Sequence, residues 1–138
     1  MQFRNFWLKR EVILGFAFTV LIAAPLIVLG GSKQVYVDKD AKGSEEGTSN
    51  HPYHSIGKAL KNAKEGTDIH IAKGTYKENI TLPKGVKLFG KKKDIGDVVI
   101  KSTNGDKPTV TMKHQTELNF LTVEGGRHGV RIEDDAKA

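Results

Sequence analysis

The residue types best suited to ligand recognition lie near the C-terminal end of the sequence. Arg127, His128 and Arg131 form a compact polar group, and guanidinium groups can pair with the carboxylates of acidic sugars. Arg131 alternates with apolar neighbours, so its side chain is expected to face outward. We predict ligand contact for these three residues, with charge balance against Glu124 and Glu133 as the alternative interpretation.

Residues that could bind metal are less well arranged. The run 38–43 begins like a calcium loop, but Lys42 occupies a ligand position, so a solvated capping loop is the alternative. His51 and His54 could share one face of a zinc site, but no third ligand accompanies them. The acids at 133–135 could begin an acidic groove or could simply be solvated. We therefore predict no catalytic residues, no metal and no cofactor for this chain.

Short β-strands must position these side chains. Between residues 66 and 90, apolar residues alternate with polar ones in brief runs separated by Gly-, Lys- and Asn-rich turns. The inward residues of these runs are Ile69, Ile71, Ile80, Leu82, Val86 and Leu88. His70 is expected to face outward between two of them. Similar runs continue to Ile132, including 98–100, 110–112, 118–123 and 130–132.

The spacing of these runs favours an all-β solenoid. Strands this short, joined by such turns, suggest a chain that winds around one apolar interior. If two strands make one turn of the chain, each coil takes roughly 20–24 residues, within the range of solenoid repeats. A two-sheet sandwich would give a similar series of strands, but it usually has longer strands and tight hairpin signals.

Residues 53–65 have the spacing of one amphipathic helix laid over the apolar interior. Asn50 or Ser55 could cap its start, and Gly66 could end it. The expected apolar face consists of Ile56, Ala59, Leu60 and Ala63.

The N-terminal segment predicts that residues 33–138 lie outside the cytoplasm. Residues 12–32 contain no charged side chain and are long enough to span a bilayer, and the basic segment 1–11 precedes them. The positive-inside rule keeps residues 1–11 in the cytoplasm and places residues 33–138 on the other side. The apolar segment is therefore a single transmembrane anchor or, alternatively, a cleaved signal for secretion.

Composition argues against a nucleic-acid-binding protein and against a protein that depends on cysteine. The 22 Lys and Arg against 16 Asp and Glu give a net charge of +6, which is modest and dispersed, so a nucleic-acid partner is not expected. The chain has no cysteine, which excludes a disulfide framework and a thiolate metal site.

Two stretches carry a resemblance to a known family. Residues 35–90 contain a YVD strand, a GT-containing polar loop, a Pro-aromatic helix entry, a GTYKENI bend and a GVKLFG strand. This run resembles the N-terminal cap and first coil of pectate-lyase-like, right-handed parallel β-helix proteins, and LNFLTVEGGRHGVRIEDDA resembles a later coil. The resemblance implies a right-handed parallel β-helix with an N-terminal capping helix. Within it, Tyr76 is expected to pack a bend under the helix and Glu78 to bind turn amides.

The resemblance also implies a function. It suggests a membrane-anchored or secreted extracytoplasmic protein that associates with polysaccharide and has no complete active site in this chain. In the related lyases, clustered carboxylates hold Ca²⁺ beside a Lys or Arg base, and such coils are expected after Ala138. Further coils or another chain should then cover the C-terminal end. Two alternatives stay open, which are a fragment of a uronide lyase or glycosidase, and a structural, adhesion or periplasmic accessory protein.

Overall fold

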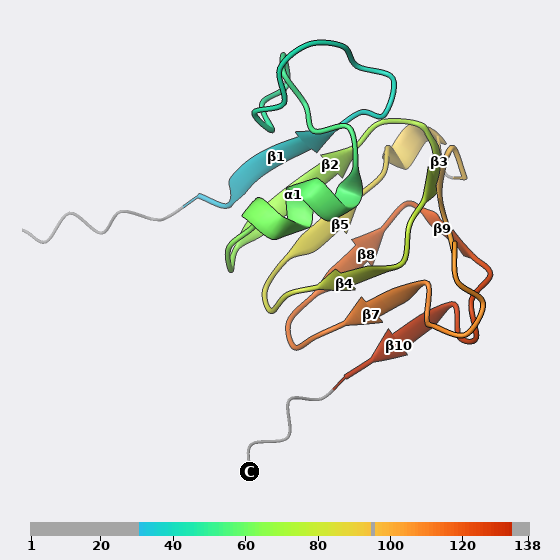
Figure 1. The fold of residues 1–138 in the computed structure, drawn as a ribbon. Coiled ribbons are helices and arrows are strands. Elements are labelled where there is room, and N and C mark those ends of the chain that lie inside the picture. Colours follow the sequence, from blue (N-terminus) through green and yellow to red (C-terminus); the bar gives the residue numbers. More distant parts are fainter. Residues whose placement is uncertain (1–30, 95, 134–138) are drawn as a thin grey trace, which may run out of the picture. The chain divides into compact units, whose positions relative to one another are not determined.

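The computed structural model describes residues 31–94 and 96–133, which form ten short strands, one α-helix and one 3-10 helix (Figure 1). Sheet A contains β1 (Lys33–Val37), β2 (Thr67–Ile71), β5 (Lys87–Phe89) and β8 (Glu117–Asn119). Sheet B contains β3 (Gly74–Lys77), β6 (Val98–Lys101) and β9 (Thr122–Glu124). Sheet C contains β4 (Ile80–Leu82), β7 (Val110–Met112) and β10 (Val130–Ile132). The helices are α1 (Ile56–Asn62) and η1 (Lys92–Asp94).

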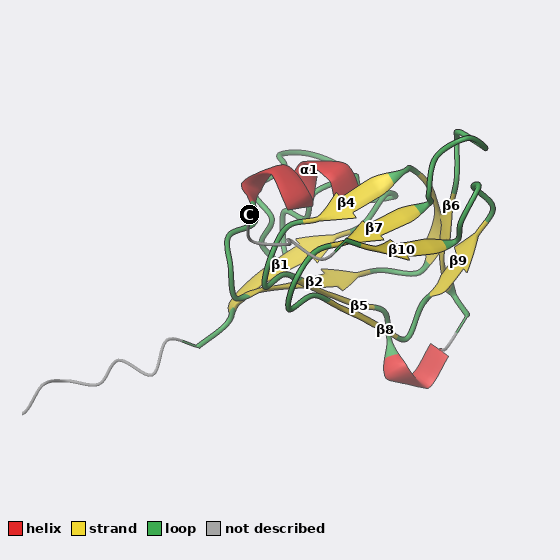
Figure 2. Ribbon diagram, turned by 90° about the horizontal axis from the view of Figure 1, so that it is seen from below, coloured by secondary structure: helices red, strands yellow, loops and turns green. Residues whose placement is uncertain are grey.

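From β2 onward, consecutive strands visit sheets A, B and C in turn. We call each such passage a coil: β2–β4 form the first coil, β5–β7 the second and β8–β10 the third. All seven strand pairs are parallel, as the resemblance implied. Seen from below, sheets A and C face each other and sheet B closes one side between them (Figure 2). This stacking is consistent with a solenoid.

The prediction of two strands per coil is wrong, because each coil has three. One strand was overlooked: β3 lies within the segment that we assigned to a turn, and only Tyr76 in it is buried. A second error concerns residues 118–123, which form parts of two strands in different sheets. Phe120 separates β8 from β9 and has a φ of 57°, a left-handed conformation that redirects the chain.

The three sheets share one apolar interior. Ile69, Ile80, Val98 and Val110 come from two coils and all three sheets, and each is at most 4% exposed within the same cluster. A strand contributes at most three such side chains, and β3 and β7 contribute one each, because alternation directs every second residue outward. Burial of one aliphatic side chain contributes about 1.5–3 kcal/mol, so the stability of the domain depends on the sum over coils.

Helix α1 is shorter than residues 53–65 suggested. It starts after Ser55, whose Oγ accepts a hydrogen bond from the Lys58 amide at 3.3 Å, and it ends at Asn62. Ala63 is already extended, with a ψ of 143°, so the helix ends before Gly66. Gly66 has a φ of 81° and belongs instead to the turn that leads into β2.

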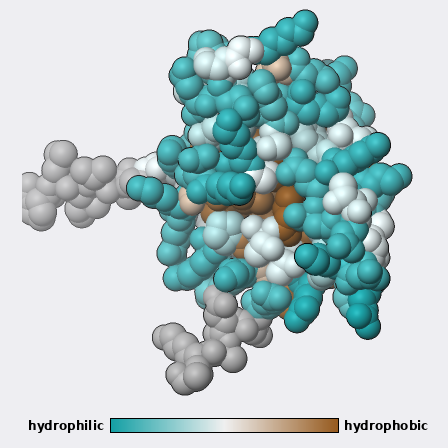
Figure 3. All heavy atoms as spheres, in the orientation of Figure 1, coloured by the Kyte–Doolittle hydropathy of each residue, from teal (hydrophilic) through white to brown (hydrophobic). Residues whose placement is uncertain are grey.

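The first coil holds the start of α1 in place. The Glu78 carboxylate, in the corner between β3 and β4, accepts hydrogen bonds from the amides of Ile56 at 2.9 Å and Gly57 at 2.8 Å. These amides have no partner within the helix, and the helix dipole favours a negative charge there. Glu78 therefore binds backbone amides, as predicted, but those of the helix. The helix also contacts β1 and β4. The face of the domain in Figure 3 is mostly hydrophilic, with a small hydrophobic patch near its middle.

The two ends of the sheet stack differ. At one end, the segment 47–53 covers the outer edge of β1, because the Tyr36 amide donates to Gly47 O at 3.0 Å and the Tyr53 amide donates to Tyr36 O at 2.9 Å. At the other end, β8, β9 and β10 are the outermost described strands of their sheets. We predicted Val130 and Ile132 as inward residues, yet they are 43% and 74% exposed. They are uncovered because no described strand lies beyond β10.

Within the described ranges, no helix has the length and apolar character needed to cross a bilayer. The predicted membrane or signal segment at 12–32 lies outside these ranges, apart from its last two residues.

Candidate functional site

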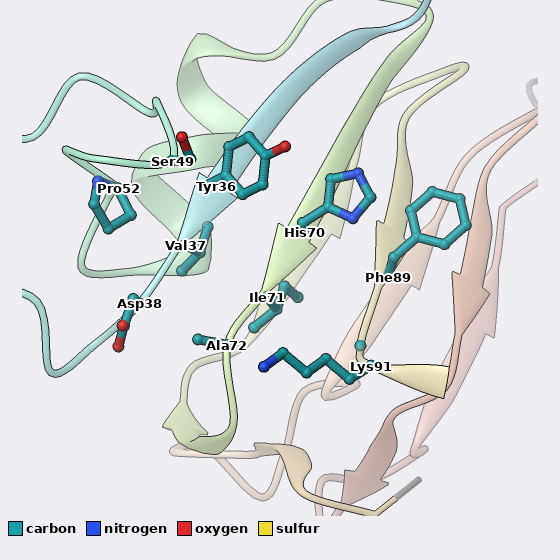
Figure 4. Close-up of a pocket in the computed structure, with 11 residues that line it drawn as sticks. Tyr36, Val37, Asp38, Ser49, Pro52, His70, Ile71, Ala72, Phe89 and Lys91 are labelled. Carbon is teal, nitrogen blue, oxygen red and sulfur yellow. The ribbon is translucent and has the colours of Figure 1, made fainter. Parts of the chain in front are cut away.

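Three aromatic rings line up across the outer face of sheet A. Tyr36 on β1, His70 on β2 and Phe89 on β5 occupy the same register position in successive strands. Their ring centroids are 5.4 Å and 5.5 Å apart, with interplanar angles of 27° and 21°. Figure 4 shows the rings side by side and nearly face-on, in a line that crosses the strands. We call these three side chains the aromatic row.

Local alternation produces this row. Each ring belongs to the residue that follows a buried aliphatic side chain, namely Val35, Ile69 or Leu88. Because neighbouring residues of a strand point to opposite faces, the ring must point outward when the aliphatic side chain points inward. Parallel pairing in register then brings the rings together. The outward orientation predicted for His70 is confirmed.

A row of hydrogen-bonding side chains runs beside the rings. It consists of Gln34, Asp68, Lys87 and Glu117, which are register neighbours two positions before the aromatic row in each strand. We call it the polar row. The Gln34 amide nitrogen lies 3.4 Å from Asp68 Oδ2, and the Ser32 hydroxyl donates to the same oxygen at 2.6 Å. These contacts hold planar polar groups at fixed positions beside the rings.

The far end of the polar row is an ion pair. Lys87 Nζ lies 2.6 Å from Glu117 Oε1. The hydrogen bond from Lys87 lowers the pKa of Glu117, and the same hydrogen bond raises the pKa of Lys87. Both groups therefore stay charged across the neutral range, and their charges compensate each other.

A hydrogen bond between the two rows orients His70. Its Nε2 contacts Gln34 Oε1, and the Gln34 amide nitrogen is already directed toward Ser32 and Asp68. Since an amide oxygen only accepts, this contact suits the tautomer of His70 that carries its proton on Nε2. The ring is thus held in the row between its two neighbouring rings and by one hydrogen bond at its edge.

The aromatic row forms one wall of a hollow of about 310 Å³ (Figure 4). The other side chains that line it include Asp38, Ser49, Pro52, Ala72 and Lys91. Aromatic faces favour contact with flat apolar surfaces, while the polar groups can hydrogen-bond at the rim. A ligand with an apolar face and hydroxyl groups around its edge matches this combination.

Of the three residues predicted to contact ligand, Arg131 lines a hollow and the other two do not line it. Arg131 lies on β10, with Nε 3.7 Å from Glu133 Oε1, beside a hollow of about 310 Å³ that Lys107 and Thr111 also line. Arg127 and His128 are exposed in the preceding turn and do not line this hollow. Their backbones anchor that turn, because the Arg127 amide donates to Lys107 O and His128 O accepts from the Thr109 amide.

The candidate metal ligands also have separate environments. Asp38 Oδ1 accepts from the Asp40 amide at 3.0 Å, which closes a local turn. His51 Nδ1 lies 3.1 Å from Ser44 Oγ, whereas His54 Nδ1 lies 3.6 Å from Glu45 Oε1. Across residues 31–94 and 96–133, no three acidic or histidine side chains gather as a metal site would require.

Tyr36 and Phe89 were not recognised from the sequence as site residues. Each sits at an outward position of a short strand, in VYV and in KLF. This outward position was the one sign in the sequence that these rings could contact a ligand. Their separation along the chain concealed it, because only the pairing of β1, β2 and β5 brings them together.

The arrangement defines a repetitive parallel-β protein with a row of half-buried, outward-facing aromatic side chains. Residues 40–130 match the family described as "Protein of unknown function (DUF1565)", and the chain belongs to this family. No curated protein and no solved structure matches the chain.

Proposed function

We propose that this chain is an extracytoplasmic β-helix protein that binds polysaccharide through the aromatic row. The fold is the right-handed parallel β-helix of the pectate-lyase-like superfamily, with α1 as its cap. Three parallel sheets visited in turn, a buried interior and an amphipathic helix near the first coil support this assignment. The domain is membrane-anchored through residues 12–32 or secreted after their cleavage.

The observation that carries the proposed binding function is the pairing of the aromatic row with the polar row. Sugar rings present C–H groups on their faces and hydroxyl groups at their edges, so they use stacking and hydrogen bonding together. Tyr36 and Phe89 supply aromatic faces, and the amide and carboxylate groups of Gln34 and Asp68 accept or donate beside them. The protein binds the polysaccharide, and this chain supplies no complete active site for cleaving it.

Affinity electrophoresis tests this proposal. The full chain, in non-ionic detergent, is run through gels that contain a panel of neutral and acidic plant or microbial polysaccharides. We expect retardation by at least one of them, and Phe89→Ala should abolish it. Thr75→Ala, at an exposed outward position of sheet B, is the matched control and should be retarded like the parent protein.

Two outcomes contradict the proposal. One is normal migration in every gel, and the other is equal retardation of the parent protein and Phe89→Ala. Thermal melting of both variants shows whether either substitution has changed folding rather than binding.

A further inference from the structure

We infer that the ligand of the aromatic row is an uncharged, extended glycan that lies along the row with one sugar residue per strand of sheet A. This inference rests on the proposed polysaccharide-binding function and specifies the class of ligand. Three observations lead to it: the spacing of the rings, the residue that continues the row, and the balance of charge around it.

The first observation is the spacing. The ring centroids are 5.4 Å and 5.5 Å apart, which is close to the length of one pyranose residue in an extended, 1→4-linked chain. This spacing follows from the separation of about 4.8 Å between neighbouring strands. A glycan that crosses the strands therefore meets a new side chain with each sugar residue. A chain that ran along the strands would meet only one ring.

The second observation is that the row continues beyond the rings. Asn119 on β8 is the register neighbour of Phe89, so it occupies the fourth position of the row. Its amide nitrogen lies 3.4 Å from Glu117 Oε2, which leaves the amide beside the end of the polar row. An amide can donate and accept hydrogen bonds with sugar hydroxyl groups. The four strands of sheet A thus define four consecutive positions for sugar residues.

The third observation is the charge around these positions. Lys87 is already paired with Glu117 at 2.6 Å, and Asp38 lines the hollow together with Lys91. Asp68 adds a further negative charge that accepts hydrogen bonds from its neighbours. A polyuronate would bring a carboxylate at every sugar residue toward these acids, and like charges brought together across an interface oppose binding.

The arginines point to the same conclusion. Arginine is the side chain best suited to bind carboxylates in two-point contacts. The described part of the chain has Arg127 and Arg131, which lie before and within β10 of sheet C, whereas the aromatic row lies on sheet A. The row therefore offers stacking and hydroxyl recognition without guanidinium groups to neutralise an acidic glycan.

Titration calorimetry with oligosaccharides of increasing length tests the inference on the full chain. The probes are uncharged β-1,4-linked glucose, xylose and mannose oligosaccharides, and galacturonate oligosaccharides of the same lengths. We expect the affinity for one uncharged series to rise up to the tetrasaccharide and then to level off. It should change little between low and high salt, because no ligand charge is involved.

Variants at the two ends of the row sharpen the test. Tyr36→Ala and Asn119→Ala should each move the plateau from the tetrasaccharide to the trisaccharide. Tyr36→Ala should also weaken tetrasaccharide binding about tenfold, whereas Tyr36→Phe, which keeps the ring, should bind like the parent protein. Thermal melting confirms that the variants are folded.

The outcomes separate this inference from the proposed function. Tighter, salt-sensitive binding of galacturonate oligosaccharides that Tyr36→Ala weakens would overturn the uncharged ligand and leave polysaccharide binding in place. A plateau that Tyr36→Ala and Asn119→Ala do not move would overturn one sugar residue per strand. Absence of binding to either series, together with normal migration in every polysaccharide gel, would reject the binding function itself.

Discussion

Tyr76 is the clearest example of a single residue whose environment sets its chemistry. Its ring is only 3% exposed, and its hydroxyl group donates a hydrogen bond to Ala72 O at 2.9 Å. Burial raises the pKa of Tyr76 to about 12, because the phenolate would lose its hydration. The sequence predicted that this ring would pack, but its place in a strand was missed.

The raised pKa of Tyr76 makes a prediction about alkaline stability. Because the folded-state pKa lies above the ordinary value of 10.0, the neutral phenol stabilises the fold fully below pH 10, and this contribution is lost as the pH rises toward 12. Tyr76→Phe should lower the stability near pH 7 by about 1 kcal/mol through the lost hydrogen bond. It should also weaken the loss of stability between pH 10 and 12.

Urea unfolding at several pH values measures both effects, and tyrosinate absorbance gives an independent reading. The absorbance that develops near pH 12 in the parent protein should be missing from Tyr76→Phe. Identical alkaline unfolding of the two proteins would show that Tyr76 does not control it.

At the scale of elements, α1 depends on a residue outside the helix. Ser55 supplies the cap that the sequence suggested, but Glu78 also binds the amides of Ile56 and Gly57 from the corner after β3. A Cβ atom on Gly57 would lie 2.9 Å from the nearer Glu78 oxygen. The glycine therefore makes room for the carboxylate, although alanine is the better helix former.

A double-mutant cycle tests this arrangement. Glu78→Ala should lower the free energy of unfolding by about 2 kcal/mol, since two hydrogen bonds to a carboxylate are lost. Gly57→Ala should also destabilise the parent protein, because it displaces the carboxylate. In the Glu78→Ala background, however, the same change should stabilise by several tenths of a kcal/mol up to about 1 kcal/mol. Additive effects in urea unfolding would contradict the close contact.

Asn79 connects two coils in a comparable way. Its side-chain oxygen accepts from the amides of Thr103 and Asn104, both at 3.0 Å, and its nitrogen donates to Pro108 O at 2.8 Å. This one side chain therefore holds the loop between β6 and β7. Alternating hydrophobicity carries no information on such a contact, so the sequence did not predict it.

Asn79→Ala should destabilise this loop rather than the whole domain, because the contacts that it removes lie in the loop. Hydrogen exchange at the Thr103 amide should accelerate at least tenfold, because it loses its acceptor, and exchange at the Asn104 amide should accelerate less, because Ser102 Oγ remains 3.1 Å away as a second acceptor. The Val99 amide, within β6 of the second coil, serves as the internal control and should exchange as before. Uniform acceleration at all three amides would indicate global destabilisation instead.

The elements that were predicted correctly share one property, which is a strong local pattern. Ile69 and Ile71, or Ile80 and Leu82, mark their strands directly. In contrast, β3 has a single buried residue among Gly, Thr and Lys, so its composition is that of a turn. The division at Phe120 depends on a left-handed conformation that an aromatic residue seldom adopts. Local patterns thus found the interior but not the number of strands per coil.

At the scale of the whole domain, the two ends of the sheet stack have different exposure. The β1 edge is covered by residues 47–53, whereas Val130 and Ile132 remain exposed on β10. Exposed apolar side chains beside an open strand edge favour association with other chains. The sequence predicted these residues as inward, and this was wrong, because no described strand lies beyond β10 to cover them.

We therefore expect Ile132→Lys to reduce concentration-dependent self-association of the full chain. Sedimentation velocity over a range of concentrations in detergent measures this change. Thr122→Lys on β9 is the control, because it adds the same charge at a position that is only partly exposed and already polar. Equal self-association of the parent protein and Ile132→Lys would show that this end does not drive contact between chains.

The candidate site was the least predictable feature of the molecule. Arg127, His128 and Arg131 are neighbours in sequence, and the structure does not place them in one hollow. Tyr36, His70 and Phe89 are far apart in sequence and stack in space. In a fold built from successive coils, residues of one site come from equivalent positions in different coils, so short-range motifs are a poor guide to it.

The second coil could be duplicated within the chain, because it begins and ends at equivalent points of the stack. A second copy of residues 83–112 inserted after Met112 would add one strand to each sheet, with each end of the stack retaining its present neighbours. Each insertion would lengthen the domain by about 4.8 Å and add one more phenylalanine to the aromatic row. If the proposed binding function holds, the number of coils would then set the length of the bound glycan, and repeated insertion would give a series of proteins graded by ligand length.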